Sequence, residues 1–197
     1  AVARDLGMVS SAIYRYVDSR DELLTRLIDD AYNSMADAVD AATTEPPEGS
    51  PLEQWMSAAH AIRDWALEHR HEYALEYGSP VPGYEAPERT SVSGTRVTRR
   101  LVAIVQQAAT DGRLAPPSDD RVDQPIDPAL AEDFAALRNE VDLEVPDLVV
   151  LDVLIAWTQL FGLLGFELFN QTRGIVDQHR ALFDAATRRT AALIGLR

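Results

Sequence analysis

The fold is decided by the segment VARDLGMVSSAIYRYVDSRDELL, residues 2–24. Gly7 is typical of the end of a first helix, and Ser10 is typical of the N-cap of a short second one. Ser19 and Glu22 have the spacing of a capping box, in which the serine and the acid each satisfy a backbone N–H at a helix start. Three helix boundaries therefore fall within about twenty residues.

The short helices at this end of the chain are expected to form a helix-turn-helix. Ala3 and Leu6 can pack on Ile13 across a tight turn, which holds the two helices at a steep angle. The second helix then presents small polar residues and one long cation to base edges in a major groove, and residues beside them reach phosphates. The predicted base contacts are Ser10, Ser11, Ala12 and Arg15, and the predicted phosphate contacts are Tyr14, Tyr16 and Arg20.

Helical periodicity continues along the rest of the chain, and alternating strand patterns with hairpin turns are not evident. The fold class is therefore predicted to be all-α. The third helix runs to a break at 45–47, a fourth begins at the capping-box sequence 50–53, and a short one ends at Gly78. After a proline-rich loop over 79–87, a long helix ends at Gly112.

The last third of the chain begins with a segment, 115–124, that is rich in proline and aspartate and is expected to be mobile. Asp127 and Pro128 then begin another helix, and two helices over 147–171 and 175–196 follow. We divide the chain into a helix-turn-helix domain with its linking helix, residues 1–45, and a helical ligand-binding and dimerisation domain, residues 46–197.

Composition excludes several classes of function. The chain has 197 residues and no Cys, so disulfides, thiolate metal sites and thiol nucleophiles are excluded. A net charge of −14 argues against a chain coated in nucleic acid, because neutralising phosphates needs clustered cations. Within residues 1–20, however, three arginines outnumber two aspartates. A local DNA-binding surface at this end is compatible with that balance.

The most apolar segment, residues 148–169, approaches the length of a membrane span. Asp152 and Glu167 interrupt it, and the uncharged stretch between them is only 14 residues long and has no basic flank. A buried helix is predicted instead, with no membrane partner. Since no signal peptide is visible, the protein is expected in the cytoplasm.

The opening segment closely resembles the DNA-binding domain of the TetR family of bacterial transcriptional regulators. That family's pattern is an Ala-x-x-x-Gly turn, an aliphatic-Tyr pair on the recognition helix, and a Ser/Asn-Lys/Arg-acid-x-Leu start to the next helix. Residues 3–7, Ile13 with Tyr14, and residues 19–23 match it without a gap. The rest of the chain resembles the family's ligand domains more loosely, in helix order and in segment 157–162. The resemblance also implies a further helix before residue 1.

The resemblance implies a repressor that binds double-stranded operator DNA as a homodimer and is released by a small-molecule effector. Helices that the family arrangement would bring together supply an aromatic and polar mixture suited to a ligand cavity. The predicted ligand contacts are Met56, His60, Tyr73, Tyr77, Leu101, Trp157 and Phe161. Each of them could instead be a core residue, and His60 could be a core histidine satisfied by a hydrogen bond.

Two small residues in the helix over 147–171 suggest where a second copy packs. Gly162 and Gly165 allow another helix to approach closely, and the last helix has apolar residues at matching spacing. The predicted dimer interface is Gly162, Gly165, Val176, Phe183, Ala186 and Leu193. Packing within one chain is the alternative, and the family resemblance together with two-fold operator symmetry favours the dimer.

Catalytic and metal chemistry find little support in the sequence. His69 and His71 are two residues apart and so do not share a helix face, and the acidic residues over 119–127 lack the glycine and spacing of a calcium loop. Nucleophile elbows, phosphate loops and dinucleotide fingerprints are not evident. We therefore expect no metal and no cofactor. A small helical enzyme or carrier that uses the same cavity remains the alternative to a regulator.

Overall fold

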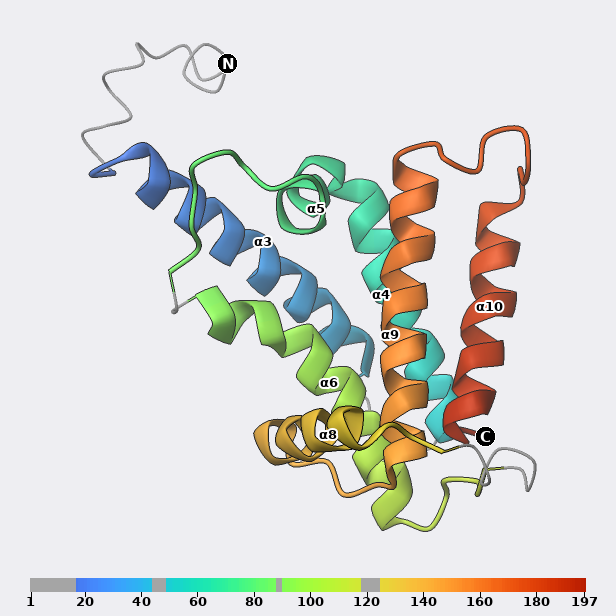
Figure 1. Ribbon diagram of the computed structural model, residues 1–197. Helices are drawn as coiled ribbons and strands as arrows, with labels where there is room; N and C mark the ends of the chain where they lie inside the picture. The colour runs from blue at the N-terminus through green and yellow to red at the C-terminus, as the bar shows by residue number, and fades with distance from the viewer. Residues whose placement is uncertain (1–16, 44–48, 88–89, 118–124) are drawn as a thin grey trace.

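The computed structural model describes residues 17–43, 49–87, 90–117 and 125–197, and within them the chain forms seven α-helices and no strand (Figure 1). The helices are α3 (Arg20–Thr43), α4 (Pro51–Glu68), α5 (Arg70–Tyr77), α6 (Thr90–Thr110), α8 (Pro128–Val141), α9 (Asp147–Leu168) and α10 (His179–Ile194). The all-α prediction is confirmed. The predicted recognition helix and residues 118–124 lie outside the described residues.

Helix starts follow the capping signals in the sequence. Ser19 Oγ accepts a hydrogen bond from the backbone N–H of Glu22 at 3.0 Å, at the start of α3. At α4 the capping box is complete, since Ser50 Oγ accepts from the Glu53 N–H at 3.2 Å and Glu53 Oε2 accepts from the Ser50 N–H at 2.6 Å. The Asp127 side chain caps α8. Each cap satisfies an N–H that the first helical turn leaves unpaired.

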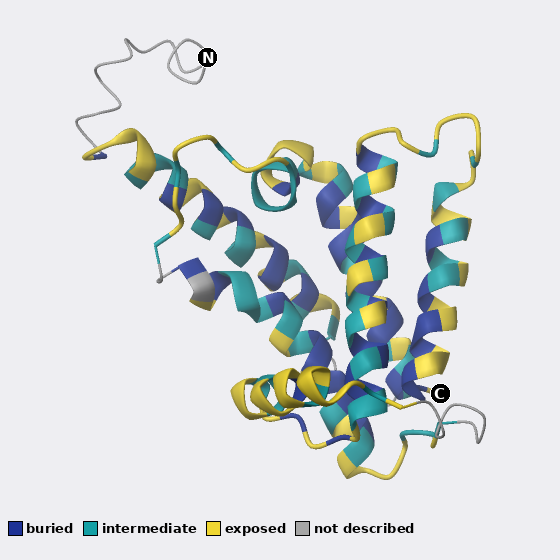
Figure 2. Cartoon of the chain, viewed as in Figure 1, coloured by how far each residue is buried: buried dark blue, intermediate teal, exposed yellow. Residues whose placement is uncertain are grey.

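The helices form two groups joined by α4. One group is α3 with α6, the other is the antiparallel pair α9 and α10, and α4 packs against both (Figure 1). Large, fully buried side chains come from every one of these helices, and buried faces point inward in Figure 2. They include Met35, Val39, Trp55, Ile62, Leu101, Val105, Leu164, Phe183 and Ile194. Because α3 shares this core, the helix that follows the helix-turn-helix segment is held firmly against the rest of the molecule.

A buried ion pair fastens α4 to α9. Arg63 is 5% exposed, and its guanidinium donates two hydrogen bonds to the Glu167 carboxylate, from Nη2 at 2.6 Å and from Nε at 3.0 Å. Two parallel bonds satisfy both charges and fix the relative position of the helices. Glu167, which interrupts the apolar segment in the sequence, thus has its partner inside the protein.

Helix α9 is the only described helix that is long and apolar enough to cross a membrane by length and composition. In the structure it packs against α4, α8 and α10, and it buries a row of apolar residues together with Asp152. This arrangement agrees with the buried helix predicted from the sequence.

The structure differs from the sequence prediction at two places. Helix α9 ends at Leu168 and α10 begins only at His179, because Asn170 and Gly174 adopt positive φ values of 57° and 78° and turn the chain between them. The helical spacing of Leu130, Phe134, Leu137 and Val141 predicts a shared apolar face for α8, but only Phe134 is buried and Leu130 is 38% exposed. Helix α8 lies at the edge of the molecule, where its first turns have little to pack against (Figure 1).

Candidate functional site

Six of the seven predicted DNA contacts, namely Ser10, Ser11, Ala12, Tyr14, Arg15 and Tyr16, lie outside the described residues. The seventh, Arg20, is the first residue of α3 and is exposed. Its backbone is fixed by the cap at Ser19, so its guanidinium is presented at the end of a helix that is anchored in the core. An exposed cation there remains the predicted phosphate contact.

Two of the predicted ligand contacts, Leu101 and Trp157, line an apolar cavity of about 200 Å³ between α4, α6, α8 and α9. Trp55 forms part of the same wall. The indole Nε1 atoms of Trp55 and Trp157 are buried and have no hydrogen-bond acceptor among the described residues. The wall of this cavity exposes no polar group, so the cavity is suited to an apolar molecule.

Three further predicted residues form a row of aromatic rings next to this cavity. Phe161 lies 5.7 Å from Trp157 and stacks on Tyr77 at 4.5 Å, as measured between ring centroids. Tyr73 packs against Tyr77 at 5.0 Å and donates a hydrogen bond from its hydroxyl to the Phe161 carbonyl at 3.0 Å. Burial raises the pKa of both tyrosines, with a smaller contribution from the neighbouring Glu76. The structure thus brings these aromatic residues of α5 and α9 together, and their contact with a ligand stays a prediction.

The remaining two predicted ligand contacts lie elsewhere. Met56 is 5% exposed and belongs to the core. His60 faces α10, where its Nε2 lies 3.2 Å from Asp184 Oδ1 and its ring lies 5.8 Å from that of Phe183. The structure thus does not bring His60 together with Leu101 and Trp157. A histidine that is hydrogen-bonded between packed helices is the alternative that the sequence left open.

A second, larger cavity of about 610 Å³ lies between α3, α5, the 79–87 loop and the start of α6. Tyr32, Glu76 and Tyr84 line it. The Tyr84 hydroxyl lies 3.0 Å from Thr25 Oγ1, which holds the loop against α3. Gly94 allows the Tyr32 ring to approach α6, since a Cβ there would lie 3.3 Å from the ring. Tyr32 also extends the aromatic row, 6.3 Å from Tyr77, so the row joins the two cavities.

This second cavity was not predicted from the sequence. Tyr32 follows Ile28 by four residues, so the helical periodicity of α3 could have placed it on the inner face. Glu76 gave no such signal, because a glutamate on a short helix is ordinarily solvated.

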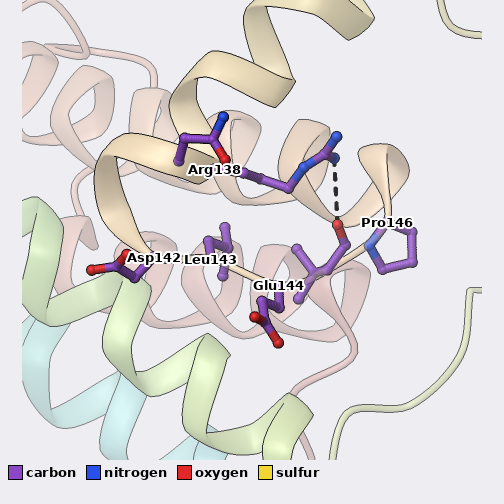
Figure 3. A pocket seen from close by; sticks show the side chains of 7 residues that line it. Arg138, Asp142, Leu143, Glu144 and Pro146 are labelled. Carbon is purple, nitrogen blue, oxygen red and sulfur yellow. Dashed lines mark hydrogen bonds between the residues drawn. The ribbon is translucent and has the colours of Figure 1, made fainter.

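A third hollow, of about 520 Å³, lies on the surface where α8 meets the turn into α9 (Figure 3). Arg138 reaches across it, and its Nη1 donates to the Val145 carbonyl at 3.4 Å. The carboxylates of Asp142 and Glu144 point away from Arg138 (Figure 3). Since the polar groups do not converge on one point, this hollow lacks the arrangement of a binding site.

The predicted dimer residues fall into two groups. A Cβ at Gly162 or Gly165 would meet nothing within 4 Å, so these glycines do not serve a close contact within the described chain. Leu193 is 37% exposed. Val176 and Ala186 are half-buried. Phe183, in contrast, is 1% exposed and packs α10 against α4, so it stabilises the protomer itself.

The described residues hold no group of three or more His, Asp or Glu side chains that could bind a metal ion. His69 lies 3.8 Å from Glu72, in an ordinary ion-pair arrangement one helical turn apart, and His71 is exposed.

Comparison with known proteins agrees with this architecture. Residues 55–190 match the family model described as tetracyclin repressor-like, C-terminal domain. The HTH-type transcriptional regulators Mb1846 of Mycobacterium bovis and Rv1816 of Mycobacterium tuberculosis are each 41% identical to the chain over 198 residues. Each match covers 98% of this chain and 82% of the relative.

Two solved structures are also similar. The crystal structure of the regulatory protein SCO4313 has a TM-score of 0.70 and 31% identity, and the match covers 97% of this chain and 83% of the other. A protein of unknown function from Rhodococcus sp. RHA1 has a TM-score of 0.62 at 20% identity, with 98% and 80% covered, and therefore shows the same fold.

Proposed function

Because the chain belongs to the TetR family of helix-turn-helix transcriptional regulators, we propose that it is a repressor that a small ligand releases from its operator. Members of this family are transcriptional regulators and not enzymes, which removes the enzyme that the sequence left open as an alternative. A cytoplasmic location follows from access to DNA.

The observation that carries ligand binding is the apolar cavity beside Trp157. Its exposed lining is apolar throughout, so burial of an apolar ligand there is favourable. A volume of about 200 Å³ limits the ligand, or the part of it that is buried, to a small molecule. The cavity borders α4 and α6, both of which pack on α3, so a ligand there can bias the position of α3.

Dimerisation uses the outer face of α9. Ile155 and Phe166 are 41% and 51% exposed. Gly162 and Gly165 lie between them in the sequence of the same helix, and a Cβ at either glycine would face open space. A second copy packed on this face, with Leu193 of α10 at its edge, buries these apolar groups. A two-fold dimer also places two recognition helices for two operator half-sites.

DNA binding is tested by selection from a pool of randomised duplexes with the full-length protein. We expect enrichment of one sequence with two half-sites related by two-fold symmetry, about one or two helical turns apart. Native mass spectrometry of the purified dimer then identifies ligands that remain bound, and each is added to the selected duplex. Failure to enrich any sequence contradicts operator binding, and enrichment with no ligand that weakens the complex contradicts the release step.

A further inference from the structure

The cavity between α3, α5 and the 79–87 loop is lined by one carboxylate and by no cationic side chain among the described residues. Among the described residues that line it, Glu76 alone carries a formal charge, and its neighbours there are tyrosines, hydroxyls and apolar side chains. Both carboxylate oxygens of Glu76 are buried and have no hydrogen-bond donor among the described residues. An unpaired carboxylate in such a place is costly, and nothing described in the chain offsets the cost.

Protonation offsets only part of that cost. Burial, followed by the charge of Glu72, raises the pKa of Glu76 to about 8. The neutral acid still has an O–H donor and acceptor lone pairs without partners. A bound cation beside the carboxylate would instead stabilise its charged form.

The titratable groups around Glu76 indicate which charge a bound molecule should carry. The titratable groups around it are Tyr32 on α3, Tyr84 on the loop, and Glu72, Tyr73 and Tyr77 on its own helix. The part of α6 that closes the cavity contributes Thr90, Gly94 and Thr95, which do not ionise. The described environment thus supplies no cation for the carboxylate.

We propose that this cavity binds a small organic cation, an amine or quaternary ammonium compound, whose charge is held by the Glu76 carboxylate. The rings of Tyr32 and Tyr84 suit the same ligand, because an aromatic face attracts a desolvated cation. A divalent metal ion does not fit, since it needs several oxygen ligands and this wall offers one carboxylate. Binding here is separate from the apolar cavity and does not require that the protein be a repressor.

The site has a direct contact with α3. Ile28 and Tyr32 form its wall on that helix, and the Tyr84 hydroxyl on the opposite wall lies 3.0 Å from Thr25 Oγ1. A cation in the cavity therefore touches the helix that follows the DNA-binding segment.

The test uses two probes of nearly equal shape, choline and its uncharged carbon isostere 3,3-dimethylbutan-1-ol, titrated by calorimetry into the full-length protein. We expect saturable binding of choline, and binding of the alcohol weaker by at least about tenfold, because only choline gains the charge interaction. Choline does not titrate, so its affinity should rise by roughly tenfold or more from about pH 6.5 to about pH 8.5 as Glu76 ionises.

Two variants complete the experiment. E76Q should bind choline no better than the alcohol, and E72Q, which alters an exposed carboxylate on the same helix, should keep the preference for choline. Equal affinity for the two probes in the unaltered protein, absence of binding, or undiminished choline binding by E76Q would each overturn the proposal. The probe comparison needs no substitution, so it decides the matter even if E76Q does not fold. None of these outcomes bears on operator binding, which the duplex selection tests.

Discussion

Glu72 and Glu76 are one turn apart on α5, and their environments are opposite. Glu72 is exposed, whereas both carboxylate oxygens of Glu76 are buried. Burial is the main cause of the raised pKa of Glu76, and the charge of Glu72 adds to it. Because a raised carboxyl pKa means that the folded state resists ionisation, Glu76 should make stability depend on pH.

Replacing Glu76 by Gln should increase stability in alkaline solution relative to the unaltered protein. The pKa of Glu76 is about 8 in the folded chain, above its value in the unfolded chain, so the protonated acid favours folding at low pH. That contribution is lost as the pH rises through 8. The difference in Tm between E76Q and the unaltered protein should therefore grow from pH 5 to pH 9, whereas E72Q should show little change. A difference that is independent of pH would contradict the burial of an ionisable group at this position.

Arg63 illustrates the opposite case, a buried charge with its partner in place. Arg63→Met leaves the Glu167 carboxylate buried and unpaired, and should cost about 3 to 5 kcal/mol in urea unfolding. The double variant with Glu167→Leu should recover part of this loss, because it removes the stranded charge. Arg180→Met provides the control. Arg180 is exposed and lies 3.6 Å from Asp64, so its loss should cost less than about 1 kcal/mol. Equal losses for the two arginine variants would contradict this account of the buried pair.

At the scale of elements, α9 has two apolar faces. One contains Leu160 and Leu164, which are 3% and 0% exposed within the protomer, and the other exposes Ile155 and Phe166. The two glycines of α9 face open space, so bulk added there has room within a protomer. The helix can therefore be altered on its outer face with little effect on the fold.

Gly162→Leu should yield a folded monomer. The new side chain meets nothing within the protomer, but a second copy packed on α9 would clash with it. Sedimentation should show loss of the dimer, and circular dichroism should show unchanged helix content. Ala103→Leu, on the exposed side of α6, adds the same bulk away from this face and should leave the dimer intact. If G162L remains dimeric, this face of α9 is not the interface.

Helix α3 is the element through which both cavities can reach the DNA-binding segment. Arg96 of α6 donates to Asn33 at 2.8 Å and to the Asp37 and Asp40 carboxylates at 2.8 and 3.0 Å. These bonds tie the middle of α3 to α6, while Tyr84 lies against its first turns. We therefore expect movement of α6 or of the loop to be transmitted to α3 through these contacts.

At the scale of the whole molecule, recognition of DNA and of ligands is expected to be carried by different residues. In the full-length protein, Arg20→Ala should weaken binding to all duplexes alike and reduce the salt dependence by about one ion, because a phosphate contact carries no sequence information. Arg15→Ala should instead cost about 1 to 3 kcal/mol on the operator and relax the preference at one position. Isotherms on selected and scrambled duplexes at several salt concentrations measure both effects. A sequence-specific loss from R20A would contradict its assignment to a phosphate.

Trp157→Phe should change the response to ligand without changing operator affinity. The substitution replaces the indole on the cavity wall by a smaller ring and so changes the apolar surface that a ligand contacts. We expect that about tenfold more of the ligand identified by native mass spectrometry is needed to release the operator, which corresponds to a loss of about 1.4 kcal/mol of apolar contact. Trp65→Phe is the control, since the Trp65 Nε1 donates to Ser34 at 3.0 Å and lies outside this cavity. An unchanged release concentration for W157F would remove the cavity from the mechanism.

The sequence by itself determined the local features of this protein. Capping residues such as Ser50 with Glu53 fixed where helices begin, because those hydrogen bonds join residues three apart. Helical periodicity predicted an all-α chain, which the structure confirms. These signals depend on separations within one or two turns of a helix.

Only the tertiary structure decided how side chains from distant helices meet. It turned His60 toward Asp184, 124 residues away, rather than toward the aromatic row. It also paired Arg63 with Glu167 while leaving Glu76 without a partner among the described residues, although all three are charged side chains on helices. Burial and pairing of a charge depend on the packing angles of whole helices, and no periodicity within a single helix encodes them.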